Sequence, residues 1–449
     1  MQALASAVTN DCMWPYHPDL LARPVPRYTS FPTAAEFTPA VGASDLQSAL
    51  REVSSDVSLY IHLPFCEKIC WYCGCNTGAA GRHTRLASYL DALHREIALV
   101  GALFERRVRV KRVAFGGGSP NAISPTDFVR LVTALTFHFP LAEPIWSVEL
   151  DPRTLTQDWG HAIASIGITH ASLGVQTFAP HIQQAIGRVQ PDAHIAQATT
   201  LLRRCGITSL TFDLMYGLPG QTRADLEASL RRTVELGANR IALFGYAHVP
   251  HMIPRQRRID AAQLPDQDER FVMAALGHDL LASARYQPVG FDHFALPGDP
   301  LAQASVAGRL HRNFQGFTED DAPVMVGLGA SAISMFPELI VQNEKNAGRY
   351  RMLLSQDRLP AALGILRSPT DQATARLIEQ LLCHGEGEVG LEQRQVCNGA
   401  LQPFLARELA EIDGARLRIL PAGLPYARTI AALFDPYRQD SAKRFSSAV

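Results

Sequence analysis

The alternation of short apolar runs with helix-like patterns is the feature that most constrains the fold of this 449-residue chain. Residues 89–104, 127–139 and 193–202 carry apolar side chains at spacings of three and four, which is typical of amphipathic helices. The strand-like runs span residues 58–63, 110–115, 145–149, 171–175, 209–214 and 240–246. Such alternation predicts an α/β fold with parallel strands. Because six units are too few for a closed eight-stranded barrel, we predict an open partial (β/α)6 barrel with its site at the C-terminal ends of the strands.

The pattern changes near residue 355. Short helical patterns at 373–382 and 402–411 then alternate with Pro and Gly, which indicates a separate and mainly helical region. We therefore predict three parts: an N-terminal arm over residues 1–50, the partial barrel over 51–355, and a mainly helical C-terminal domain over 356–449.

Composition excludes several classes of protein. The chain is 47% hydrophobic with a formal net charge of -1, which suits a large core and gives no sign of nucleic-acid binding. It contains no run of 18 apolar residues and no signal-like start, so we expect no membrane span and a cytoplasmic location. Four of its eight cysteines are scattered, namely Cys12, Cys205, Cys383 and Cys397, which indicates a reducing compartment rather than disulfide bridges.

The other four cysteines lie within ten residues, directly after the first strand-like run. Cys66, Cys70, Cys73 and Cys75 form a thiol-rich loop, and clustered thiolates select zinc or an iron-sulfur cluster. A zinc site usually combines two pairs of Cys or His ligands that are far apart in sequence, so zinc is the less favoured alternative. Only one residue separates Cys73 from Cys75, which makes it difficult for both to join one cluster. We therefore predict three ligands, Cys66, Cys70 and Cys73, and one iron left open for a substrate or cofactor.

The spacing Cys-x3-Cys-x2-Cys, with Tyr72 just before the last ligand, resembles the signature of the radical S-adenosylmethionine (SAM) superfamily. Three further features narrow the resemblance to one family within the superfamily. They are the adjacent Cys75 and Asn76, the segment 60–65 (Tyr-Ile-His-Leu-Pro-Phe) and the segment 27–33 (Arg-Tyr-Thr-Ser-Phe-Pro-Thr). Together they resemble the oxygen-independent coproporphyrinogen III oxidases, or dehydrogenases, from about residue 27 to about residue 343. The resemblance implies a [4Fe-4S] cluster on the three cysteines and two bound molecules of SAM.

The same resemblance assigns roles to polar residues at the ends of the predicted strands, although each residue taken alone is more often structural. Gly117, Gly118 and Ser119 correspond to the segment that meets the amino group of SAM, where the family usually has Thr followed by an aromatic residue and this chain has Ser and Asn121. Glu149 would accept hydrogen bonds from the ribose of the first SAM. The implied contacts of the second SAM are Gln176, Arg188, Asp213, Ala247 and Ile333.

The tetrapyrrole substrate of the resembled enzymes carries four propionates, so cationic and amide side chains are its expected partners. We predict Arg27, Arg309, Arg312 and Gln315 as weak candidates, with ordinary surface positions as the simpler explanation of any one. The polar, Pro-rich arm would act as a lid that becomes ordered on binding. Tyr60 is two residues before His62 on one strand, so both side chains share a face. The resemblance implies that Tyr60 contacts the SAM site and acts with Cys75 in catalysis.

The implied reaction is the oxidative decarboxylation of two propionates of coproporphyrinogen III to vinyl groups, giving protoporphyrinogen IX in anaerobic haem biosynthesis. A radical formed from SAM removes a hydrogen from the propionate β-carbon, and loss of carbon dioxide and one electron completes each step. A one-electron reductant such as flavodoxin or ferredoxin is implied, and we expect a monomer. The alternatives are a haem-binding chaperone of the same superfamily or another radical SAM enzyme acting on a tetrapyrrole. Cys75 and the segment 27–33 argue against the chaperone.

Overall fold

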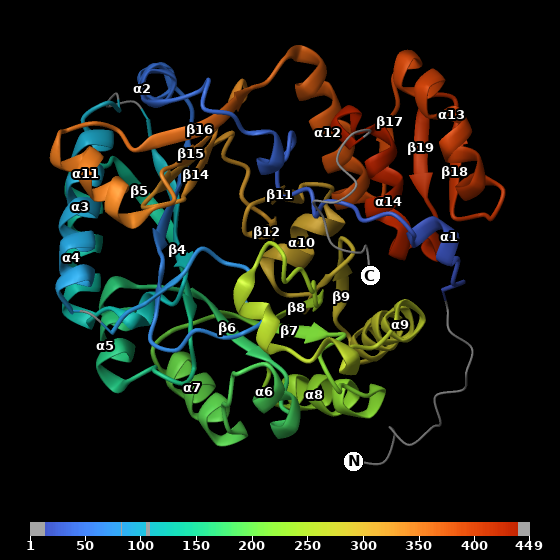
Figure 1. Ribbon diagram of the computed structural model, residues 1–449, viewed down its shortest axis with the longest axis horizontal. Coiled ribbons are helices and arrows are strands. Elements are labelled where there is room, and N and C mark those ends of the chain that lie inside the picture. The colour runs from blue at the N-terminus through green and yellow to red at the C-terminus, as the bar shows by residue number, and fades with distance from the viewer. Residues whose placement is uncertain (1–13, 82, 105–107, 439–449) are drawn as a thin grey trace.

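A computed structural model describes residues 14–81, 83–104 and 108–438. Its centre is a twelve-stranded sheet (Figure 1). Six neighbouring strands of this sheet are parallel and follow one another in chain order. They are β1 (Val57–Leu63), β4 (Val110–Gly117), β5 (Leu141–Leu150), β6 (His170–Gln176), β7 (Ser209–Tyr216) and β8 (Arg240–Gly245). Each contains one of the six runs expected from the sequence, so the predicted parallel α/β architecture is confirmed.

The sheet continues past these six strands at both edges. On one side β13 (Val324–Leu328) pairs in parallel with β1, and three antiparallel strands follow it. These are β14 (Ile333–Met335), β15 (Leu339–Asn343) and β16 (Ala361–Leu366). On the other side β10 (His293–Ala295) pairs antiparallel with β8, and β9 (Gln287–Val289) closes the edge. Since β16 falls inside the predicted domain 356–449, the sheet reaches beyond the predicted boundary, and the division into domains stays a prediction.

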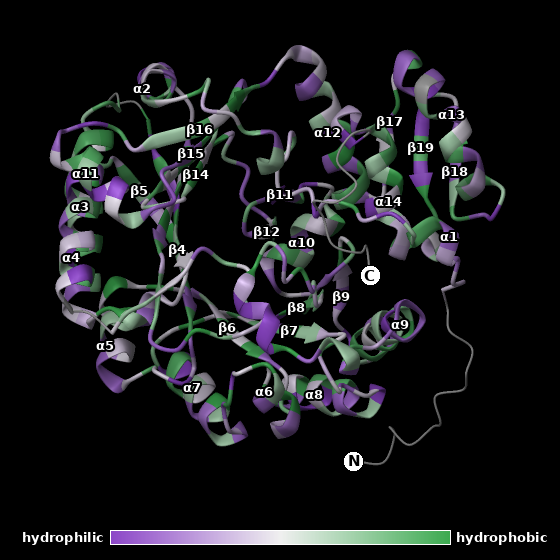
Figure 2. Cartoon of the chain, in the orientation of Figure 1, coloured by the Kyte–Doolittle hydropathy of each residue, from purple (hydrophilic) through white to green (hydrophobic). Residues whose placement is uncertain are grey.

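Helices cover the outer face of the parallel strands and follow the margin of the molecule in Figure 1. They are α3 (His83–Gly101), α4 (Pro125–His138), α5 (Gln157–Ile166), α6 (Pro180–Ala185), α7 (Asp192–Arg204), α8 (Arg223–Glu235), α9 (Gln267–Ser283) and α11 (Ala347–Ser355). Local sequence explains where they begin. Ser124 caps α4 by accepting from the Asp127 N–H, with Pro125 in the first helical position, and Thr222 forms a capping box with Asp225 in α8. Hydrophilic and hydrophobic colours alternate along the outer helices, as expected for amphipathic helices (Figure 2).

The C-terminal region is mainly helical, as predicted, but it also contains a small antiparallel sheet. Its elements are α12 (Pro369–His384), β17 (Glu386–Glu388), α13 (Leu391–Leu405), β18 (Ala410–Asp413), β19 (Arg416–Ile419) and α14 (Ala427–Ala431). Gly385 ends α12 in the left-handed conformation at φ 72°, which turns the chain into β17. The helix expected at 402–411 is wrong beyond Leu405, because Ala410–Asp413 pairs with β19 instead.

Residues 14–31 of the predicted arm pack against the C-terminal region, whereas Val41, Leu46 and Leu50 belong to the main core around the sheet. The described part of the arm contains α1 (Pro18–Leu21) and α2 (Ala43–Glu52). Trp14, Leu21 and Phe31 are buried in one hydrophobic cluster with residues of α12, α13 and α14. The hydroxyl of Tyr28 donates to Asp435 Oδ2 at 2.9 Å. This part of the arm is thus built into the folded structure, whereas residues 1–13, including Cys12, lie outside the described residues.

A buried ion-pair network closes the N-terminal ends of the parallel strands. Arg112 near the start of β4 and Arg240 at the start of β8 both contact Glu319 Oε1, at 2.9 and 3.2 Å. Arg240 Nε also pairs with Asp299 Oδ1 at 2.6 Å. Burial raises the pKa of Glu319, but Arg240 and Arg112 outweigh it and bring the pKa down to about 2. These charges tie two strands to one carboxylate at the end of the barrel that faces away from the cysteine loop.

Among the described helices, none is long and apolar enough to cross a lipid bilayer.

Candidate active site

The parallel strands bring the predicted residues to one edge of the sheet. Gly117 ends β4, Gln176 ends β6, and Glu149 and Asp213 lie within the last few residues of β5 and β7. Tyr60 lies on the neighbouring strand β1. Because the C-terminal ends of parallel strands meet at one edge, residues up to 150 positions apart in sequence come together here.

The cysteine loop is held over this edge. The short strands β2 (Phe65–Cys66) and β3 (Gly78–Ala79) pair and close the loop at its base. Along the loop, the Trp71 N–H donates to the carbonyl of Ile186 at 3.1 Å, and Gln256 Nε2 donates to the carbonyl of Tyr72 at 2.9 Å. These bonds come from the end of α6 and from the segment after β8. The loop is therefore fixed from several sides of the barrel.

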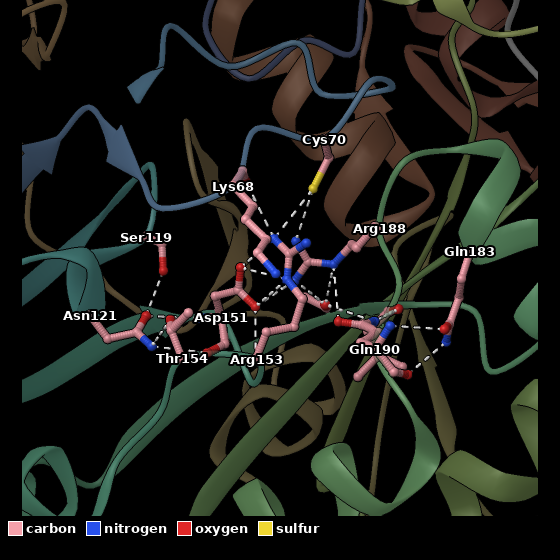
Figure 3. Close-up of polar contacts among 12 residues, drawn as sticks. Lys68, Cys70, Ser119, Asn121, Asp151, Arg153, Thr154, Gln183, Arg188 and Gln190 are labelled. Atoms are coloured by element: carbon pink, nitrogen blue, oxygen red, sulfur yellow. Dashed lines mark hydrogen bonds and ion pairs between the residues drawn. The ribbon is translucent and has the colours of Figure 1, made fainter. Parts of the chain in front are cut away.

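Two guanidinium groups point at one of the predicted ligands (Figure 3). Arg188 Nη1 lies 3.2 Å from Cys70 Sγ, and Arg153 Nη2 lies 3.6 Å from the same sulfur. Cationic neighbours favour the thiolate form that binds iron. Burial, followed by the influence of Cys73 and Cys70, raises the pKa of Cys66 to about 12. This thiol therefore ionises only when a metal offsets the cost of burying its charge.

Cys73 and the spare thiol Cys75 interact directly. The backbone N–H of Cys75 lies 3.4 Å from Cys73 Sγ. Their side-chain hydrogen bond lowers the pKa of Cys73 to about 6 and raises the pKa of Cys75. Cys73 is therefore the more acidic thiol of the pair, and the assignment of Cys73 as ligand and Cys75 as spare thiol stays a prediction.

The three predicted ligands fit an iron-sulfur cluster by their chemistry. Among the described residues, no three His, Cys, Asp or Glu side chains are grouped to hold a single metal ion. A cluster makes a different demand, because each thiolate binds its own iron. Cys66, Cys70 and Cys73 lie near enough to influence one another's ionisation, and Cys70 faces two cations. This donor set suits a [4Fe-4S] cluster bound through three thiolates.

The glycine segment after β4 allows two functional side chains to approach the backbone. A methyl group on Gly116 would lie 2.5 Å from the Glu149 carboxylate, and one on Gly117 would lie 2.2 Å from the His62 ring. Gly117 also has φ 99°, which favours glycine. Its N–H donates to Glu149 Oε2 at 3.1 Å, and burial raises the pKa of Glu149 to about 7. The segment therefore positions Glu149 and His62.

Gly118 and Ser119 join this segment to its neighbours. A methyl group on Gly118 would clash with the backbone of Leu63. The buried hydroxyl of Ser119 donates to Asn121, whose Nδ2 donates to the carbonyl of Asp151 at 2.9 Å. Asn121 therefore ties the glycine segment to the end of β5.

Tyr60 lies near both Glu149 and Cys75 of the cysteine loop. Its hydroxyl is 3.2 Å from His62 Nδ1, and burial lowers the pKa of His62 to about 4, so this ring is neutral near pH 7. Burial, and then the nearby Glu149 and Cys75, raise the pKa of Tyr60. Both predicted catalytic residues are thus gathered around Glu149. His62 was placed on this face by its strand period, but the sequence did not identify it as a site residue.

Arg188 has more partners than the sequence suggested. Its Nε donates to the carbonyl of Gly174 at 3.0 Å and to Gln190 Oε1 at 3.2 Å, and its Nη2 lies 3.5 Å from Asp151 Oδ1. Arg153 pairs with the same carboxylate at 2.6 Å (Figure 3). Asp151, Arg153 and Gln190 were missed, because no pattern in the sequence shows which strand ends meet.

The remaining residues assigned to the second SAM surround the same edge. Asp213 accepts from Ser172 Oγ at 2.7 Å, and burial raises its pKa. Gln176 has φ 68°, a left-handed conformation that is uncommon for a residue with a side chain. Ala247 and Ile333 are half-buried, on the segment after β8 and on β14.

The structure brings two of the four substrate candidates together. Arg312, on β11 (His311–Asn313), donates through Nη2 to the backbone carbonyl of Arg27 at 3.1 Å. Arg27 Nη2 in turn donates to the carbonyl of Gly245 at the end of β8, at 2.9 Å. Arg309 and Gln315 are exposed and take no part in these contacts.

Comparisons with known proteins identify the family of this chain. Residues 60–233 match the Radical SAM superfamily, the part of the chain that carries the cysteine loop and the ends of β1 to β7. A protein of Bradyrhizobium diazoefficiens described as oxygen-independent coproporphyrinogen III oxidase is 39% identical over 439 residues, covering 95% of this chain and 97% of the relative. One of Pseudomonas aeruginosa with the same description is 35% identical, covering 94% and 96%.

The likeness extends to the solved structure of coproporphyrinogen III oxidase from Escherichia coli, which is described as a radical SAM enzyme. It superposes with a TM-score of 0.89 at 31% identity and covers 94% of this chain and 99% of that one. The chain belongs to the family of oxygen-independent coproporphyrinogen III oxidases.

Proposed function

We propose that this protein converts two propionate groups of coproporphyrinogen III to vinyl groups by radical SAM chemistry and so serves anaerobic haem biosynthesis. The observation that carries the proposal is the full-length likeness to enzymes described by this activity, joined to a cysteine loop that retains all three ligand thiols beside Tyr60 and Glu149. The [4Fe-4S] cluster and SAM supply the radical that removes hydrogen from the propionate side chain.

The chain's own residues position the reactants. Cys66, Cys70 and Cys73 hold the cluster, and the cations beside Cys70 offset negative charge. Glu149, buried against the glycine segment, accepts hydrogen bonds from a ribose diol. Tyr60 carries its proton throughout the physiological pH range and lies near Glu149 and Cys75.

A second SAM molecule binds, in our proposal, where Gln176, Arg188 and Asp213 meet. Arg188 would pair with its carboxylate and Asp213 with its ribose. Equilibrium dialysis should then count two molecules of SAM for each reconstituted chain, and Asp213→Asn should reduce the count to one. A count of one in the unaltered protein would contradict this part of the proposal.

We also propose a compartment, an oligomeric state and an electron donor for the reaction. The seven described cysteines are all free, which suits the reducing cytoplasm and a monomer that needs no bridges. A small one-electron donor such as a flavodoxin or ferredoxin would reduce the cluster.

Complementation tests the function against the haem-carrier alternative. The gene should restore anaerobic growth and haem synthesis to a bacterium that has lost its own coproporphyrinogen oxidases. The Cys66→Ser variant should fail, and Cys205→Ser should succeed. If the unaltered gene fails while the protein is made and binds haem, the carrier is the better assignment.

A further inference from the structure

A cavity lies where the N-terminal arm, the barrel and the C-terminal region meet. The space between the protein atoms here, open solvent included, is about 620 Å³. Its wall includes Trp14 and Arg27 of the arm, Gly245 at the end of β8, and Arg428 of α14. The contribution of β8 places it on the same edge of the barrel as the cysteine loop.

Most of this wall lies outside the superfamily core. Of the residues that form it, Tyr216 alone falls within the 60–233 segment that matches the Radical SAM superfamily. The rest come from the arm, from residues 243–294 and from the C-terminal region. A site built from these parts is suited to what distinguishes this family, which is its substrate, rather than to SAM, which the whole superfamily shares.

Among the described residues that line the cavity, cations outnumber carboxylates. Arg27 and Arg428 line it, and Asp292 is the one carboxylate among its described wall residues. Asp292 is engaged with His293 Nδ1 at 2.6 Å. Arg312 joins the group through its bond to the Arg27 carbonyl, and in the described part of the chain neither Arg27 nor Arg312 forms an ion pair. Burial and then the charge of Arg27 lower the pKa of Arg428 to about 10, as expected where like charges are crowded.

Arg270 of α9 adds a fourth cation beside the wall. A methyl group on Gly245 would lie 3.2 Å from Arg270 Nη2, so this guanidinium lies against one wall residue. Arg270 Nε and Arg312 Nη1 are buried and have no hydrogen-bond partner among the described residues. Buried guanidinium donors of this kind are costly unless an anion satisfies them.

The aromatic lining favours a ligand built of aromatic rings, such as the pyrroles of a tetrapyrrole. Arg312 stacks on Phe317 at 4.3 Å and on Phe291 at 4.9 Å, and Arg27 lies over Phe244 at 5.2 Å. Phe244 and Phe291 are themselves wall residues. Aromatic faces with guanidinium groups at their edges match an apolar macrocycle that carries carboxylates on its rim.

We propose that this cavity binds the propionate edge of the tetrapyrrole, with Arg27, Arg270, Arg312 and Arg428 as its carboxylate partners. The inference rests on the proposed function and deepens it by naming two arginines, Arg270 and Arg428, that the sequence did not single out. It also gives the C-terminal region a role in choosing the substrate.

Equilibrium binding tests the cavity without turnover. Coproporphyrin III, the stable oxidised form with four carboxylates, is titrated into the full-length protein and followed by its fluorescence, with its tetramethyl ester as the uncharged probe. Arg270→Gln and Arg428→Gln should each weaken coproporphyrin III binding roughly tenfold or more. Arg376→Gln, at an exposed position on α12, is the matched control and should leave affinity unchanged. Binding of the ester should be the same in all four proteins.

Thermal unfolding of the variants shows whether a protein that has lost affinity is still folded. Because Arg270 Nε has no partner and Arg27 repels it, Arg270→Gln should unfold at the same temperature as the unaltered protein or higher. Equal affinity for coproporphyrin III in the unaltered protein and both arginine variants would overturn the cavity assignment and leave the proposed function intact. Equal losses with the ester would also overturn it, since they would indicate packing alone. If the unaltered protein does not bind coproporphyrin III, the cavity assignment fails, and anaerobic turnover of coproporphyrinogen III decides the proposed function separately.

Discussion

At the scale of single residues, the account depends on the different roles of neighbouring thiols. Cys66→Ser removes a cluster ligand, so iron content and the cluster's visible absorbance should be lost. Cys75→Ser should keep both, because Cys75 is outside the ligand set, while turnover falls roughly a hundredfold. Iron analysis and absorbance after anaerobic reconstitution measure the difference, with half-buried Cys205→Ser as the control. Loss of iron from Cys75→Ser to the same extent as from Cys66→Ser would overturn the ligand assignment.

The sequence predicted the residues whose spacing or position along the chain indicates a chemical role without knowledge of the fold. Cys66, Cys70 and Cys73 form a ligand motif within one loop, and Glu149 interrupts an apolar run at the end of a strand. Asn121 and Arg153 could not be found in this way. Their contacts with Asp151 and Cys70 depend on which strand ends face one another, and that follows from the three-dimensional fold.

At the scale of secondary-structure elements, the charged network at the N-terminal ends of β4 and β8 holds the barrel strands together. The pKa of Glu319 is about 2, below its ordinary value of 4.5. Its contribution to stability is therefore fully present above about pH 4.5 and is lost as the pH falls toward 2. Glu319→Gln should lower the unfolding free energy by roughly 3 kcal/mol at pH 7, since it leaves Arg112 and Arg240 without their shared carboxylate.

Thermal unfolding of Glu319→Gln across pH 3 to 7 checks this prediction. The difference from the unaltered protein should shrink as the pH falls below about 4.5, because protonation removes the same charge from Glu319 itself. Glu338→Gln, at an exposed position between β14 and β15, should show little change at any pH. A difference that stays constant from pH 7 to pH 3 would show that the ion pairs do not carry the effect.

The elements of the core were predictable and those of the edges were not. Each of the six parallel strands that follow one another along the chain contains five or more consecutive residues of largely apolar character, and all six were found, whereas β13 was not. The strands β9, β10 and β14, which lie outside the parallel part of the sheet, are three residues long, and β10 and β14 pair with the longer strands β8 and β15. A run of three residues has no detectable period.

At the scale of the whole molecule, residues 14–31 of the arm and the C-terminal region form one hydrophobic cluster, although they are about 400 residues apart in sequence. Tyr28→Phe removes the buried hydrogen bond to Asp435 and should lower the unfolding free energy by about 1 kcal/mol. Tyr16→Phe removes a longer bond, 3.3 Å to Gln267, from a half-buried hydroxyl and should cost less. Thermal unfolding compares the two, and an equal or larger loss in Tyr16→Phe would contradict the packing described.

Deleting residues 1–26 tests the arm as a lid over the substrate. The deletion removes Trp14, a wall residue of the cavity, together with buried Leu21 and Val25. Coproporphyrin III affinity should fall. Unchanged affinity in a truncated protein that still folds would show that the arm does not cover the substrate. No pattern in the sequence predicted that the arm would pack against the C-terminal region, because the partners are distant and each side is apolar without a distinctive spacing.

Anaerobic turnover of coproporphyrinogen III is the measurement that tests the central claim most directly. The reconstituted protein is supplied with SAM and a reductant, and the mass of the tetrapyrrole is followed together with 5′-deoxyadenosine. We predict the stepwise loss of two carboxyl groups as carbon dioxide, with deoxyadenosine formed alongside each loss. An unchanged tetrapyrrole, from a protein that holds its cluster and still cleaves SAM, would contradict the account.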